Sequence, residues 1–149
     1  MLQRIQSLYL TLVAILSILI YFFPFAAYPK ETIITLYLTN INQLLASATF
    51  LMYIIIILNV AILALSLITI FKYKNRILQM RLNAFNFLFN ALLLIGIYWL
   101  TEKAAKEYET FSHYKLGSLL PFIMMLLIFL ANKNIKKDEE KVRAADRLR

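Results

Sequence analysis

Four long apolar stretches alternate with polar segments along the chain. They cover about residues 5–23, 50–71, 82–100 and 116–131. A helix needs roughly 20 predominantly apolar residues to cross the hydrocarbon core of a bilayer, so each stretch is predicted to be a membrane span, the fourth being short. We expect an all-α protein in which residues 1–131 form an antiparallel bundle of four transmembrane helices.

The fourth stretch has an unusual entrance, because Gly117, Ser118 and Pro121 lie close together there. Proline is tolerated in the first turn of a helix, where an N–H group has no intrahelical partner to lose. The pattern predicts a helix that begins close to Ser118, has Pro121 in its first turn and runs past Ala131 toward the C-terminus.

The polar segments predict three further features. In the first outer connection, residues 32–39 (TIITLYLT) are rich in β-branched residues and alternate with period two, which predicts a short β-strand or hairpin at the membrane surface. In the second, residues 101–115, the i, i+4 pair Glu102/Lys106 indicates a continuing helix. The segment 132–149 contains no Gly or Pro and is predicted to be a basic helical tail in the cytoplasm.

Positive charge distinguishes the two sides of the predicted bundle. Of the 16 Lys and Arg residues, the two outer connections hold only Lys30, Lys103, Lys106 and Lys115. Acidic residues balance these lysines, whereas the N-terminus, the segment 72–81 and the tail carry the remaining basic residues. Because Lys and Arg near the ends of spans are retained on the cytoplasmic side, both termini are predicted to be cytoplasmic. The same rule explains the net charge of +8 without a nucleic-acid partner.

Neutral polar residues recur at helical spacing along one face of each of the first three spans. They are, span by span, Gln3, Ser7 and Thr11; Asn59 and Ser66; and Asn83, Asn86 and Asn90. A side-chain amide that faced lipid would lack a partner. We therefore expect these side chains to point inward and to form interhelical hydrogen bonds of roughly 0.5–2 kcal/mol each.

The same residues permit an alternative interpretation, a hydrophilic cavity or path through the bundle. It predicts a small transporter or a lipid-binding membrane protein that uses the Asn-lined interior. Between the ends of the four spans there is no Asp, Glu, Lys, Arg or His, and proton-coupled transporters usually carry their proton on such a group. The sequence therefore disfavours proton-coupled export.

Catalytic and metal-binding chemistry lacks its usual residues. The chain contains no cysteine, one histidine (His113) and two glycines. A serine nucleophile needs a base and an orienting partner, and a metal needs several convergent ligands. We therefore predict no enzyme activity, no metal site and no cofactor, and we interpret His113 as an interfacial residue.

The cytoplasmic loop and tail carry the candidate contacts to a partner or to lipid headgroups: Lys74, Arg76, Arg81, Lys136, Lys137, Arg143, Arg147 and Arg149. Two interpretations stay open. The tail is either an electrostatic anchor on anionic headgroups or a docking helix for a cytoplasmic protein or another subunit. Acidic residues at 138–140 interrupt the basic run, which weakens attraction to anionic lipid and favours docking.

Three segments resemble a known family: residues 1–10 (MLQRIQSLYL), 74–82 (KNRILQMRL) and 135–149, which begins IKKDE and ends ADRLR. They are similar to the small four-pass membrane proteins grouped as domain of unknown function 4293, and the resemblance covers the whole chain. Those proteins are found in Gram-negative bacteria of the Bacteroidetes type and have no assigned activity. The resemblance implies a bacterial inner-membrane location and no chemistry.

These features together predict a non-catalytic integral inner-membrane protein, an accessory, scaffold or assembly subunit of a membrane complex. We expect the cytoplasmic loop and tail to contact a protein partner or a second copy of the chain. Membrane lipids, including those with anionic headgroups, are the other expected partners. A transporter or lipid-binding role for the Asn-lined interior is the alternative.

Overall fold

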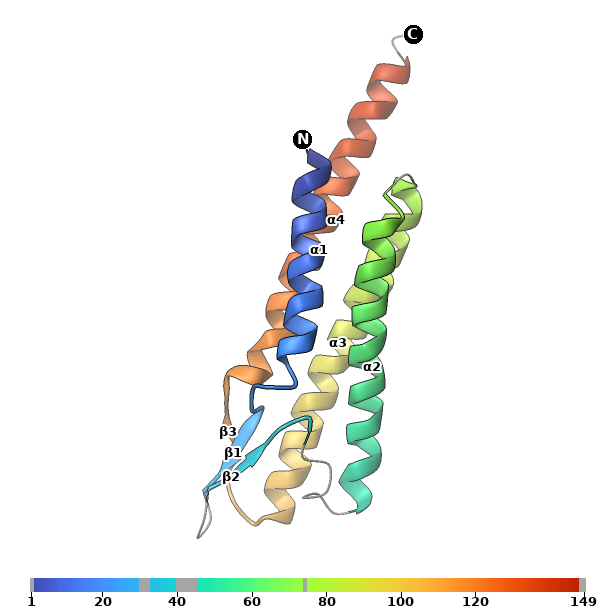
Figure 1. The fold of residues 1–149 in the computed structure, drawn as a ribbon. Helices are drawn as coiled ribbons and strands as arrows, with labels where there is room; N and C mark the ends of the chain where they lie inside the picture. Colours follow the sequence, from blue (N-terminus) through green and yellow to red (C-terminus); the bar gives the residue numbers. More distant parts are fainter. Residues whose placement is uncertain (1, 30–32, 40–45, 74, 148–149) are drawn as a thin grey trace.

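Four α-helices form the body of the protein: α1 (Leu2–Leu19), α2 (Ala46–Phe71), α3 (Arg76–Glu107) and α4 (Leu116–Arg147). The computed structural model describes residues 2–29, 33–39, 46–73 and 75–147. Helix α1 packs against α2 and α4, and α3 packs against the same two helices. The helices run antiparallel around a common core (Figure 1), so the predicted four-helix bundle is confirmed.

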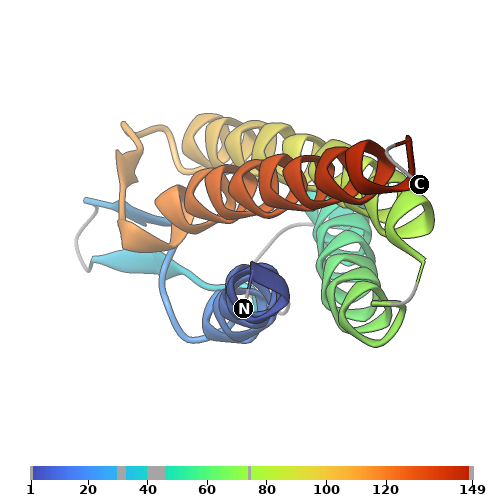
Figure 2. The same cartoon turned by 90° about the horizontal axis from the view of Figure 1, so that it is seen from above.

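The two ends of the bundle carry different structures (Figure 1). One end, here called the termini end, holds the start of α1, the connection from α2 to α3 and the final turns of α4. Figure 2 looks down on this end, where α4 lies next to both α1 and α3. The opposite end, called the sheet end, holds both connections that the charge pattern predicts to be outside.

Among the described residues, three helices contain segments long and apolar enough to cross a membrane: Thr49–Phe71 in α2, Arg76–Glu107 in α3 and Leu116–Val142 in α4. The apolar part of α1, Ile5–Leu19, is shorter, although the whole helix spans about 27 Å at 1.5 Å per residue. Large apolar side chains are exposed along all four helices, which is the surface that contact with lipid requires. The chain is a multi-pass helical membrane protein.

A small antiparallel sheet closes the sheet end. Its strands are β1 (Ala26–Tyr28), β2 (Ile34–Leu36) and β3 (His113–Tyr114), in the order β2-β1-β3. Strands β1 and β2 pair antiparallel, so the hairpin predicted in the first outer connection is confirmed. Thr32, at the start of the predicted strand, lies outside the described residues.

The second outer connection differs from the predicted helix through residue 115. Helix α3 ends at Glu107, and Glu109 turns the chain with a positive φ of 51°, a backbone conformation uncommon outside glycine. Strand β3 then pairs with β1, and the Lys115 amide donates to the Phe25 carbonyl (2.8 Å). Strand β1 provides hydrogen-bond partners for the backbone of this segment. The i, i+4 pairs that favour helix contribute only tenths of a kcal/mol each, too little to keep the segment helical.

Helix α4 begins at Leu116, and Pro121 lies in its second turn, so the predicted start near Ser118 is slightly late. Close approach to the chain leaving α1 explains the position of Gly117. Its amide donates to the Pro24 carbonyl (3.0 Å), and a Cβ there would lie 2.6 Å from the same oxygen. Only glycine lets α4 start so close to the end of α1. From there the helix continues to Arg147 without a break.

Tyr28 attaches the sheet to α3. Its side chain is fully buried, its hydroxyl donates to the Thr101 carbonyl (3.0 Å), and its ring centroid lies 5.3 Å from that of Tyr108. Burial, reinforced by the neighbouring Tyr108, raises the pKa of the Tyr28 hydroxyl well above its usual value. The hydroxyl therefore remains a hydrogen-bond donor at neutral pH.

Candidate functional site

A column of buried polar side chains runs along the inside of the bundle. This polar column comprises Ser17, Asn59, Ser66, Thr69, Gln79, Asn83, Asn86, Asn90 and Thr101. Its members come from α1, α2 and α3. They offer hydrogen-bonding groups but no group that exchanges a proton near neutral pH.

Two predicted asparagines of the polar column bond between helices. Asn59 Nδ2 donates to the Ser17 carbonyl (2.8 Å) and joins α2 to α1. Asn86 Nδ2 donates to Ser66 Oγ (2.8 Å) and joins α3 to α2. Asn90 Nδ2 instead donates to the Asn86 carbonyl (3.0 Å), within α3.

A third interhelical bond involves a residue absent from the sequence predictions. Gln79 Nε2 donates to the Thr69 carbonyl (2.8 Å), close to the connection between α2 and α3. The signal for Gln79 is present in the sequence, because it lies four residues before Asn83 on the same helix face. Its carbonyl partner in α2 has no sequence signal.

The predicted polar face of α1 departs from the observed one. Thr11 is exposed, and its hydroxyl donates to the Ser7 carbonyl (2.8 Å) within α1 rather than across to another helix. Hydroxyl side chains reach the carbonyl four residues back without help from a neighbouring helix. Ser7 is half-buried, and the side chain of Gln3 lies outside the described part of the chain. Among the side chains of α1 that the structure describes, the buried polar ones are Gln6 and Ser17.

Asn83 differs from the other asparagines of the polar column. It is fully buried, yet among the described residues neither Nδ2 nor Oδ1 has a hydrogen-bond partner. It lines a cavity of about 230 Å³ between α3 and α4, together with Ala84, Phe87, Ile128, Phe129 and Asn132. These six residues form what is called the notch below.

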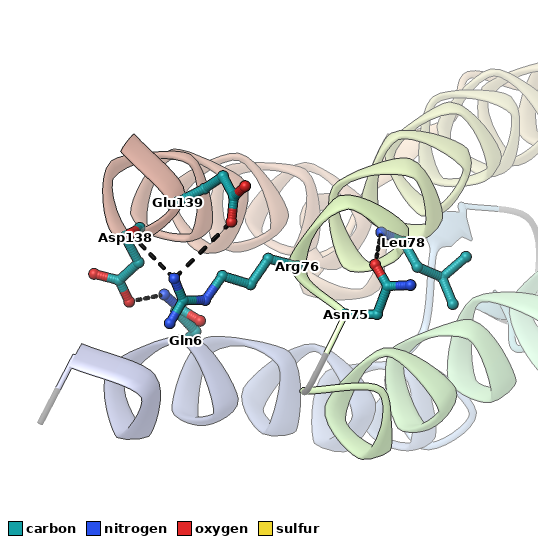
Figure 3. Close-up of polar contacts among 6 residues, drawn as sticks. All are labelled: Gln6, Asn75, Arg76, Leu78, Asp138 and Glu139. Carbon is teal, nitrogen blue, oxygen red and sulfur yellow. Dashed lines mark hydrogen bonds and ion pairs between the residues drawn. The ribbon is translucent and has the colours of Figure 1, made fainter. Parts of the chain in front are cut away.

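A second polar cluster ties α4 to the rest of the bundle at the termini end (Figure 3). Gln6 Nε2 donates to Asp138 Oδ2 (2.6 Å). Arg76 Nη1 donates to the Asp138 carbonyl (3.2 Å) and lies 3.9 Å from Glu139 Oε2. These four residues, the tail clamp, connect α1, α3 and α4.

The tail clamp contributes little to the stability of the bundle and mainly fixes the direction in which α4 leaves it. The Arg76 and Glu139 side chains are 34% and 19% exposed, and ion pairs in contact with water contribute about 0–1 kcal/mol. Asn75 caps α3 beside the clamp, since its Oδ1 accepts the Leu78 amide (3.0 Å; Figure 3). With α3 capped and α1 bonded to the same turn of α4, the outgoing end of α4 has a defined direction.

The basic residues predicted to contact a partner or headgroups have different environments. Arg76 turns inward to the tail clamp, which the sequence does not indicate. Arg81, Lys136 and Lys137 are exposed. Lys74, Arg149 and the side chains of Arg143 and Arg147 lie outside the described part of the chain.

The sheet end holds a hydrogen-bonded acid. Glu102 Oε1 accepts from Ser112 Oγ (3.0 Å) and from the Tyr114 hydroxyl (2.8 Å), and Tyr114 stacks on Tyr98 with ring centroids 6.1 Å apart. Burial, followed by the hydrogen bond to Glu102, raises the pKa of Tyr114 to about 12. At neutral pH the tyrosine is a donor rather than a base. Glu102 also lines an open cavity of about 420 Å³ with Lys106.

In the described ranges, no three His, Asp or Glu side chains gather as a metal site would require. The family model described as domain of unknown function (DUF4293) matches residues 2–148. The chain belongs to the DUF4293 family. No curated protein and no solved structure matches it.

The DUF4293 match extends over the bundle and the tail alike. The tail is therefore part of the family domain and not an appendage to it. The model is described as a domain of unknown function, so membership of DUF4293 names no role. The role has to be inferred from the surfaces that the fold presents.

Proposed function

We propose that this DUF4293 protein is a non-catalytic accessory, scaffold or assembly subunit of a membrane complex. In this proposal the projecting part of α4 and the connection from α2 to α3 contact a partner protein. The observation that carries the proposal is the course of α4. One helix continues from the bundle past the ends of its three neighbours (Figure 1), and the tail clamp holds it where it leaves them.

The exposed residues of the projecting helix suit a protein surface better than a lipid surface. Glu140 and Lys141 are exposed beside Val142, which is 42% exposed. The projecting helix therefore exposes an apolar side chain as well as charges of both signs, and a helix bound in a groove is recognised through apolar anchors of this kind. Attraction to anionic lipid depends mainly on net charge, and Glu140 reduces that charge.

The proposed location is the bacterial inner membrane, with both termini in the cytoplasm. Two observations support this orientation. The N-terminus, the connection from α2 to α3 and the outgoing α4 lie together at the termini end (Figure 1), and these segments carry most of the lysine and arginine. Basic segments next to membrane spans are retained on the cytoplasmic side.

The polar column supports a packing role rather than a catalytic one. Asn59 and Asn86 use their amide hydrogens to join neighbouring helices. Bonds of this kind hold membrane helices together. A scaffold needs such a fixed core, because a partner recognises the direction in which the projecting helix leaves the bundle.

The test compares the native tail with a tail of scrambled order. Residues 140–149 (EKVRAADRLR) are permuted, while Asp138 and Glu139 remain in the tail clamp. We expect unchanged membrane level and melting temperature, but an about tenfold lower recovery of a crosslinked partner, equivalent to about 1.4 kcal/mol of binding. The chain is purified from its own membranes after crosslinking, and partners are quantified by mass spectrometry.

A second variant is the matched control. Lys106→Gln removes one exposed charge at the sheet end, away from the proposed docking surface, and leaves the order of the tail intact, so it should retain the partner. If the scrambled tail also keeps every protein that the native tail recovers, the tail is an electrostatic anchor and the docking proposal is wrong.

A further inference from the structure

The notch opens on the outer wall of the bundle, and Asn83 is the member of the polar column that lines it. Ala84, Phe87 and Phe129, three of its six residues, are exposed. Its neighbours on that wall are therefore lipids. A cavity of about 230 Å³ is too small for a drug-sized ligand but has room for one part of a larger molecule whose remainder lies along the helices.

Three buried polar atoms of notch residues have no hydrogen-bond partner among the described residues: Nδ2 and Oδ1 of Asn83 and Oδ1 of Asn132. In the part of the chain that the structure describes, Asn83 Nδ2 is the one buried side-chain nitrogen without an acceptor, whereas unpaired oxygens recur at Asn59, Asn90 and Asn132. Orphaned N–H donors are rarer than under-used carbonyl oxygens. Lipid covers this wall, so a lipid oxygen can supply the acceptor. An acceptor oxygen from a lipid would satisfy Asn83 Nδ2.

The depth of the notch matches the ester region of a lipid. Asn83 lies about 24 Å along α3 from Trp99, an exposed aromatic residue of the kind that marks a membrane interface. With a hydrocarbon core of about 30 Å, Asn83 falls just inside the opposite boundary, at the termini end. The ester carbonyls of a glycerophospholipid lie at this level.

Lys136 provides a positive charge at the membrane depth where the lipid phosphate is expected. Lys136 follows Asn132 by one turn of α4, about 6 Å toward the tail and on the same helix face, and it is exposed. No charged residue lines the notch itself. The phosphate therefore remains outside, beside Lys136, while the uncharged part of the same lipid enters between α3 and α4.

We propose that the notch binds one anionic diacyl glycerophospholipid from the leaflet at the termini end. An ester carbonyl accepts from Asn83 Nδ2, an acyl chain lies along Phe87 and Phe129, and the phosphate pairs with Lys136. The lipid fills the groove between α3 and α4 just below the tail clamp. This site is tested separately from the protein-docking proposal, because its residues on α4 end at Lys136, before the permuted segment 140–149.

The test measures lipid binding to the full chain in a neutral detergent. Phosphatidylglycerol is titrated, and bound lipid is counted by native mass spectrometry. We expect one tightly bound molecule, with at least about tenfold weaker binding of the dialkyl ether analogue, which has no ester carbonyl. Zwitterionic phosphatidylcholine should bind about tenfold more weakly as well, and free glycerol phosphate, which lacks chains, should not bind.

Variants separate a built site from general attraction to the bundle. Asn83→Leu removes the donor, and Ala84→Phe fills the notch without removing a polar group, so each should abolish the tightly bound lipid. Asn90→Leu is the matched control, since this asparagine is buried in the polar column but does not line the notch. It should keep the lipid.

The role of Lys136 is tested in the same way. Lys136→Gln should remove the preference for phosphatidylglycerol over phosphatidylcholine. Lys137 is also exposed but lies on another face of α4, so Lys137→Gln should preserve the preference. Melting without lipid shows whether each variant is folded. If Asn83→Leu and Ala84→Phe bind phosphatidylglycerol as the native chain does, or if ester and ether lipids bind alike, the proposal is wrong.

Discussion

Gly117→Ala is expected to lower the free energy of unfolding by about 2–3 kcal/mol, the upper part of the range for an overpacked interior. The added Cβ would lie 2.6 Å from the Pro24 carbonyl oxygen and 2.7 Å from that of Phe23. Both are backbone atoms that cannot rotate away. The chain leaving α1 would have to move from the start of α4, breaking the bond from the Gly117 amide to Pro24. Thermal unfolding in detergent measures the loss.

Gly96→Ala is the matched control for this prediction. Its Cβ would lie 3.2 Å from Ile55 Cγ1, a side-chain atom that can shift. Alanine also favours helix over glycine by about 1 kcal/mol, so we expect a change close to zero. Equal melting temperatures for Gly117→Ala and Gly96→Ala would contradict the close contact between α1 and α4 at the sheet end.

Tyr28→Ala is expected to cost about 3–5 kcal/mol, the usual range for removing a large buried aromatic ring. The ring is fully buried between the sheet and α3, in contact with Tyr108, and its loss leaves a cavity. Tyr28→Phe keeps the ring and removes only the hydrogen bond to the Thr101 carbonyl, so about 1 kcal/mol is expected. Melting in detergent compares the two variants.

Limited proteolysis locates the effect of these substitutions. If Tyr28 attaches the sheet to α3, Tyr28→Ala exposes the outer connections to protease well before the helices unfold. Equal losses for Tyr28→Ala and Tyr28→Phe would contradict the account, because they would mean that the buried ring contributes nothing beyond its hydroxyl.

The membrane helices could be predicted from sequence because their signal is local and long. Runs such as residues 50–71 contain enough consecutive apolar residues to indicate a span without knowledge of any neighbour. The β1–β2 hairpin has a weaker but still local signal in the alternation around Ile34 and Leu36. Strand β3 has two residues, too few for a period, and it exists because β1 presents free backbone groups beside it.

The tail clamp was less predictable because the residues that contact one another in it are distant in sequence. Gln6 and Asp138 in the tail clamp are 132 residues apart, and neither segment contains a pattern that predicts their contact. The sequence suggests that Arg76 faces outward and that the acids at 138–140 only dilute positive charge. In the fold, Asp138 and Glu139 hold Arg76 and orient α4.

Asn83 illustrates the same limit within one helix. Its spacing from Asn86 and Asn90 places all three on one face, and the sequence pattern does not distinguish between them. A small rotation around α3 separates them: Asn86 reaches Ser66 on α2, whereas Asn83 lies at the groove with α4. Which neighbour a helical face meets depends on the packing of the bundle, which one sequence does not state.

The most direct test of the account is the sidedness of the projecting helix. The chain has no cysteine, so Lys141→Cys and Phe111→Cys each introduce one thiol at an exposed position. A membrane-impermeant maleimide is applied to spheroplasts before and after permeabilisation. The account predicts that Phe111→Cys reacts in intact spheroplasts and that Lys141→Cys reacts only after permeabilisation. Reaction of Lys141→Cys in intact spheroplasts would contradict it.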